Sequence, residues 1–117
     1  GQAAAKAVSS ELSQAQRESE LGWQVDVAGL DGNGPVRSIQ VRVKDRSGLP
    51  IDRLEAELRL QRPGAVEAAL TVPLAALDAG TYGGVLRLPA SGRWLAELRL
   101  LRDREVQYQL SQELLAP

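Results

Sequence analysis

The sequence contains no cysteine, no histidine and no methionine among its 117 residues. Without cysteine there is no disulfide, no thiol nucleophile and no thiolate metal site. Without histidine the chain lacks the commonest metal ligand and the commonest general base. Without methionine it cannot build a thioether site for copper(I). We therefore predict that the chain is not an enzyme and that it has no catalytic residues, no cofactor and no metal.

The polar side chains that remain form no recognisable catalytic arrangement. A serine nucleophile would need Lys6 or Lys44 as its base, and the pattern places one on a helix and the other on an exposed strand face. Asp31 and Asn33 are too few for the roughly 6–8 oxygens of a calcium site. The carboxylates that could act in acid–base pairs fall beside arginines on outer strand faces, where surface ion pairing is expected. These pairs are Glu55 with Glu57 and Glu97 with Glu105.

The charge balance argues against strongly charged binding partners. Fourteen basic residues face 15 acidic ones, for a net charge of -1. This balance does not favour nucleic acid or an anionic membrane surface. No run of 18 apolar residues is present, so nothing in this sequence is long enough to span a bilayer. The length and a hydrophobic content of 44% predict one globular domain.

Aromatic residues make up only 3% of the chain. With so few, we expect them to supply much of the bulk of the core. They are Trp23, Tyr82, Trp94 and Tyr108. An alternative is that Trp23 and Trp94 stack on a sugar at the surface.

The chain begins Gly1-Gln2 rather than with methionine. We expect it to be a fragment, and a targeting or membrane segment could lie in the missing part.

Residues 3–21 form the single helical candidate, and Gly22 stands where the helix would end. Val8, Leu12 and Ala15 recur at helical spacing on one thin apolar stripe. A helix with so few large residues is marginal alone in water. It could pack on the body of the protein, continue an upstream helix or bind a partner. If a partner-facing surface exists on this helix, we expect it to be the stripe.

After Gly22 the hydrophobic period changes to two. Alternation between turn signals predicts strands near 23–27, 38–44, 54–61, 66–72, 82–88, 94–100 and 105–110. Even-numbered residues from Leu54 to Leu110 are expected to face inward. Pro73 is expected to end the fourth strand, with a short turn of helix over 74–77, and the tail over 111–117 is expected to fray. About seven strands at this spacing predict a small antiparallel β sandwich over residues 23–114.

The stretch 78–82 reads Asp-Ala-Gly-Thr-Tyr at the start of a strand. This is the spelling of a tyrosine corner in immunoglobulin-like sandwiches, in which the phenol hydroxyl bonds back to the backbone of its own turn. It makes the predicted class mainly β, with an immunoglobulin-like antiparallel sandwich preceded by an N-terminal α-helix.

Five motifs, in this order and spacing, resemble the FixH family, also called CcoH. They are the helix end Ser19-Glu20-Leu21-Gly22-Trp23, the strand and turn over 41–51, the break Gln61-Arg62-Pro63, the corner Gly80-Thr81-Tyr82 and the strand start Gly92-Arg93-Trp94. Together they cover nearly the whole chain. YtkA-like proteins, which are similar sandwiches, are a related possibility.

The resemblance implies a short cytoplasmic start, one membrane helix, a helical stretch and a β sandwich on the extracytoplasmic, periplasmic side of the bacterial inner membrane. It implies a role in the assembly or stability of cbb-type cytochrome c oxidase, beside a copper P-type ATPase and an iron–sulfur membrane protein. The implied partners are oxidase subunits or the copper ATPase, and the implied action is binding rather than catalysis. The alternative is a secreted or surface module that binds protein or carbohydrate.

The sequence departs from the family pattern in two respects. The aromatic-rich start of the family's helical stretch is not visible here. In addition, no side chain in the sequence is suited to hold copper, so we do not expect this domain to carry copper itself.

Overall fold

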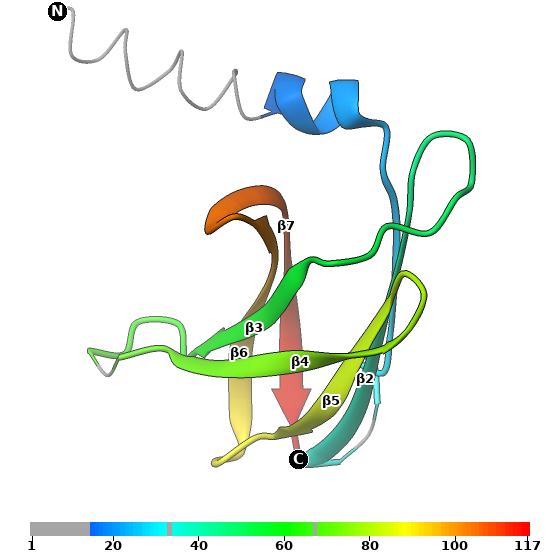
Figure 1. The fold of residues 1–117 in the computed structure, drawn as a ribbon. Helices are drawn as coiled ribbons and strands as arrows, with labels where there is room; N and C mark the ends of the chain where they lie inside the picture. Colours follow the sequence, from blue (N-terminus) through cyan, green and yellow to red (C-terminus); the bar gives the residue numbers. More distant parts are fainter. Residues whose placement is uncertain (1–14, 33, 67) are drawn as a thin grey trace, which may run out of the picture.

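The computed structural model describes residues 15–32, 34–66 and 68–117. This part of the chain consists of a helical stretch over residues 15–21 followed by antiparallel strands (Figure 1). The strands are β1 (Gln24–Ala28), β2 (Val36–Lys44), β3 (Glu55–Gln61), β4 (Leu70–Asp78), β5 (Thr81–Arg87), β6 (Gly92–Arg102) and β7 (Glu105–Ala116).

The strands form one curled sheet in the order β1-β2-β5-β4-β3-β6-β7. β4 pairs with β3 along residues 70–74 and with β5 along residues 75–78, so the sheet turns back on itself at this strand. As a result β1, β2, β5 and β4 form one layer, and β3, β6 and β7 form the other (Figure 1). This grouping is that of an immunoglobulin-like sandwich, and the predicted mainly β class is confirmed.

Alternating residues of both layers fill the space between them. Odd-numbered residues from 37 to 43 are buried on β2, and even-numbered residues are buried along β3 and along residues 94–100 of β6. Each large apolar side chain so buried contributes about 1.5–3 kcal/mol before the cost of chain ordering. The period of two therefore specifies which face of each strand turns inward.

The fourth strand differs from the prediction. β4 begins at Leu70 and continues through Pro73, so there is no helical turn over 74–77. Val66, Ala68 and Leu70 are exposed rather than inward-facing, and Val66 is completely so at 103%. The reason is that the half of β4 with Pro73 pairs only with β3, so a residue without an N–H group is tolerated there.

The last strand is longer than predicted. β7 extends to Ala116, and both Leu114 and Ala116 are buried, so the tail is part of the sandwich and does not fray. Leu110, expected inside, is 36% exposed. It lies on an outermost strand of the sheet, where one flank is open.

Tyr82 joins the two layers. Its side chain is 2% exposed, and its hydroxyl donates to the carbonyl oxygen of Ile51 at 2.8 Å and accepts from the N–H of Leu54 at 3.2 Å. The expected bond to its own turn is therefore wrong. Both partners lie in the segment that crosses from β2 in one layer to β3 in the other, so the phenol ties this crossover to the start of β5.

Arg37 is buried at 4% exposure on β2, in phase with the apolar residues of that strand. Its guanidinium donates to three backbone carbonyl oxygens: Leu30 at 2.7 Å, Gly34 at 3.1 Å and Leu115 at 2.6 Å. The first two lie in the β1–β2 loop and the third lies near the end of β7. Arg37 therefore links β2 and the β1–β2 loop to β7 in the other layer, at one end of the sandwich.

We expect Tyr82→Phe to lower the free energy of unfolding by about 1–3 kcal/mol, because it leaves a buried N–H and a carbonyl without their partner. Urea denaturation measures this change. Tyr108→Phe is the matched control at a half-buried tyrosine and should cost clearly less. Equal losses in the two variants would contradict the role given to the Tyr82 hydroxyl.

We expect Arg37→Met to cost at least about 2 kcal/mol, because hydrogen bonds to charged groups contribute about 1.5–3 kcal/mol each. Arg42→Met is the control, since Arg42 is exposed on the opposite face of the same strand. Urea denaturation of both variants compares them. A loss in Arg37→Met no larger than in the control would show that the bridge does not hold the sandwich together.

Candidate interaction surface

The helical stretch is held on the sandwich by the β2–β3 turn. It ends at Gly22, whose φ of 64° is the left-handed conformation of a helix end. Arg46 donates to the carbonyl oxygens of Ser19 at 3.4 Å and Glu20 at 2.9 Å. A cation at the last carbonyls of a helix is favourable for both its charge and its hydrogen bonds. Arg46 also lies where a side chain on Gly22 would stand.

Asp45 organises the turn that presents Arg46. Its carboxylate accepts from the backbone N–H and the hydroxyl of Ser47 at 2.9 and 2.7 Å, and from the N–H of Leu49 at 3.0 Å. These bonds favour the ionised form, the one from the Ser47 hydroxyl most strongly, and lower the pKa of Asp45 below its usual range.

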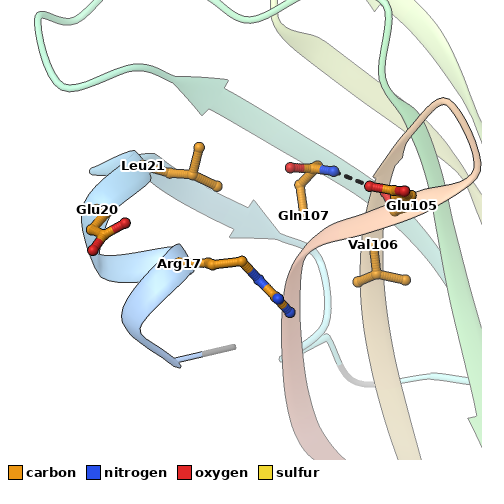
Figure 2. Close-up of a pocket in the computed structure, with 6 residues that line it drawn as sticks. All are labelled: Arg17, Glu20, Leu21, Glu105, Val106 and Gln107. Carbon is orange, nitrogen blue, oxygen red and sulfur yellow. Dashed lines mark hydrogen bonds between the residues drawn. The ribbon is translucent and has the colours of Figure 1, made fainter. Parts of the chain in front are cut away.

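A hollow of about 610 Å³ lies between the helical stretch and the β6–β7 hairpin. Figure 2 shows Arg17, Glu20 and Leu21 on the helical side, and Glu105, Val106 and Gln107 on the hairpin side. The amide of Gln107 donates to the carbonyl oxygen of Glu105 at 3.3 Å. With Leu21 and Val106 as apolar residues among polar ones, the hollow can receive a side chain or a short segment, but it presents no reactive group.

Tyr108 lies next to this hollow and packs, half-buried, against the core. Burial first and the negative charge of Glu18 second raise the pKa of the Tyr108 phenol. The influence of Glu18 agrees with the hollow's lining, in which Glu20 and Leu21 of the last helical turn lie opposite Val106 and Gln107 at the start of β7.

Of the predicted partner-facing residues, the structure describes Ala15 alone. Val8 and Leu12 lie outside the described residues, and Ala15 is exposed. The contact of the helical stretch with the body involves Leu21 and Glu18 instead. Leu21 is the one large apolar residue of the last helical turn. Its position in the sequence is the signal from which this contact with the body could have been predicted.

The four aromatic residues occupy two environments. Tyr82 and Trp94 are buried, whereas Trp23 and Tyr108 are half-buried and pack against the core. The indole N–H of Trp94 donates to the carbonyl of Ala90 at 2.9 Å, and the Arg62 guanidinium lies 5.6 Å from the centre of its ring. Trp94 is therefore covered and does not form a stacking platform at the surface.

The candidate acid–base carboxylates are separated into ion pairs. Glu57 pairs with Arg99 at 3.1 Å, and Glu97 lies 3.8 Å from both Arg59 and Arg99. This is the surface pairing expected on the outer face of β3 and β6. The two remaining carboxylates are exposed. They are Glu55 and Glu105.

Of the two candidate calcium residues, the structure describes Asp31 alone. Asp31 accepts from the amide of Gln112 at 2.6 Å, and Asn33 lies outside the described residues. Within residues 15–32, 34–66 and 68–117, no three His, Cys, Asp or Glu side chains gather as a metal site would require. In the same ranges no helix is long and apolar enough to cross a membrane.

In the comparison with protein families, the FixH family model matches residues 3–115. No curated protein and no solved structure matches the chain.

We expect the phenol of Tyr108 to titrate above its ordinary value of about 10. The raised pKa means that folding favours the neutral phenol. Its contribution to stability is therefore full below pH 10 and is lost as the pH rises through the raised pKa. NMR of ring-labelled tyrosine follows the titration.

Glu18→Gln should lower the pKa of Tyr108 only in part, because burial is the larger cause. Glu20→Gln, a change on the same helical turn, is the control and should have less effect. If Glu18→Gln left the Tyr108 titration unchanged, the helical turn would not lie against β7.

Proposed function

The chain belongs to the FixH family, and from this membership we propose that it is the extracytoplasmic domain of a membrane-tethered protein that supports assembly or stability of cbb-type cytochrome c oxidase. The family links the chain to cytochrome oxidase biogenesis, and its members are typically membrane-anchored with an extracytoplasmic domain. The observation that carries the proposal is the extent of the match, which covers residues 3–115 and so includes the helical stretch and the sandwich.

The proposed action is binding rather than catalysis. The sequence has no histidine or cysteine, and the carboxylates that could form an acid–base pair on β3 and β6 are engaged by arginines. What the described structure offers is a rigid sandwich with a hollow beside the helical stretch and an open strand edge. These are features that recognise another protein.

The proposed partners are the oxidase subunits or a copper P-type ATPase that supplies metal for the oxidase. The chain is proposed to hold such a membrane protein during assembly, without carrying copper itself. The absence of histidine, cysteine and methionine supports this division, because these residues supply the usual copper ligands.

Deletion of the gene in its own host tests the proposal. We expect oxidase activity and haem-stained oxidase subunits to fall in the membranes, and the full-length gene to restore them. Tagged full-length protein should co-purify with an oxidase subunit or the ATPase. A host that assembled active oxidase normally after the deletion would contradict the proposal and favour the alternative of a surface binding module.

A further inference from the structure

β7 is the last strand in the sheet order, and no strand of the described chain pairs with its outer edge. The carbonyl of Leu115 faces away from β6, because it accepts from Arg37. In an antiparallel pair, every second residue directs its backbone groups toward the same side. With the unbroken register from Leu100 to Gly92, Gln109, Ser111 and Glu113 therefore present their N–H and C=O groups on the open side.

The open edge lacks the residues that usually prevent strand pairing. Proteins guard such edges with lysine, proline, inward charges or a covering loop. β7 contains no lysine, arginine or proline over its length from Glu105 to Ala116. A covering loop is present at one end, where Arg37 binds Leu115 and Asp31 binds Gln112. The loop reaches segment 109–113 only through the side chain of Gln112, and among the described residues no loop bonds to the backbone of Gln109, Ser111 or Glu113.

The core is also incompletely covered beside this edge. Tyr108 on β7 is half-buried against the core, and Leu110 on the same strand is 36% exposed. β1 is the opposite end of the sheet order and does not pair with β7. A strand added alongside β7 would place every second side chain toward these apolar residues.

We propose that segment 109–113 of β7 binds an extended strand from a partner protein. Alternate side chains of the partner strand would be apolar where they face Tyr108 and Leu110, and polar or basic where they face outward. Unpaired backbone groups in a row select an extended strand. Glu113 is the charged residue of the segment, and Arg93 on β6 pairs with it at 3.5 Å, so the selection rests on the backbone groups and the apolar neighbours rather than on charge. This inference rests on the proposed function, because it assigns the surface on which the proposed partner protein would bind.

The surroundings of the edge favour a slim segment over a second copy of the chain. Two antiparallel β7 strands centred on Ser111 would bring Leu115 of one copy opposite Gln107 of the other. The β1–β2 loop covers the first position through Arg37, and the helical stretch flanks the second across the hollow. These two bulky elements would meet in a dimer, whereas a single strand can enter between them.

A capped peptide in which valine alternates with threonine, with a lysine at each end, is the probe. In NMR titration of the purified chain, we expect the amide signals of Gln109, Ser111 and Glu113 to shift. A peptide of the same composition with its valines adjacent should shift them less. Failure of the alternating probe at millimolar concentration, or shifts confined to other strands, would overturn the inference.

Ser111→Pro removes one outward N–H without removing a bond to β6. We expect it to weaken probe binding by at least about fivefold, the equivalent of one hydrogen bond. Ser111→Ala, which keeps the backbone group, should bind as the unchanged chain does. Gln109→Lys combined with Ser111→Lys is a second blocking variant that keeps every backbone group. Equal probe binding by the three variants and the chain without substitution would overturn the inference. The inference would also be overturned if the chain without substitution formed a concentration-dependent dimer that Ser111→Pro dissociates.

The same variants in the full-length protein separate this inference from the proposed function. We expect Ser111→Pro to reduce oxidase assembly in cells and Ser111→Ala to preserve it. If deletion of the gene abolished assembly but Ser111→Pro left it normal and the probe did not bind, the edge inference alone would be wrong. If the probe bound but deletion had no effect on the oxidase, the proposed function alone would be wrong.

Discussion

Because β4 pairs with β3 along one half and with β5 along the other, the sheet is continuous on one side of the molecule. On the other side it ends in β1 and β7, and each of these has one edge that no described strand pairs with. This topology determines where the two layers must be tied together and where strand edges face solvent. Tyr82 secures the crossover between the layers. Arg37 links β2 and the β1–β2 loop to β7 through backbone carbonyls, which a charged guanidinium can satisfy when buried.

The helical stretch and the open edge form one connected region. Arg46 fixes the end of the helical stretch from the β2–β3 turn, and the hollow beside Leu21 leads to the start of β7. A partner strand that lay along β7 would pass directly toward this hollow. In the proposed function the chain acts by binding, and this region is the surface that we propose for a partner segment.

Local patterning was sufficient for the class, the strand count and the inward faces of β3 and β6, where alternation is strict. It failed where a long-range partner decides. Pro73 reads as a strand end, yet it is tolerated because that half of β4 has one neighbour. Arg37 is in phase with buried residues, but its partner Leu115 is 78 positions away. Of the predicted partner face, only Ala15 is described, and the open edge is a property of topology that no single stretch encodes.

Amide hydrogen exchange along β7 tests the open edge most directly. In the chain alone, we predict slow exchange at Leu110, Gln112 and Leu114, whose N–H groups the strand alternation directs toward β6, and fast exchange at Gln109, Ser111 and Glu113. This period of two in the exchange rates is the signature of a strand with one free side. Uniformly slow exchange over 109–114 would mean that the outer edge is already paired, and would contradict the account.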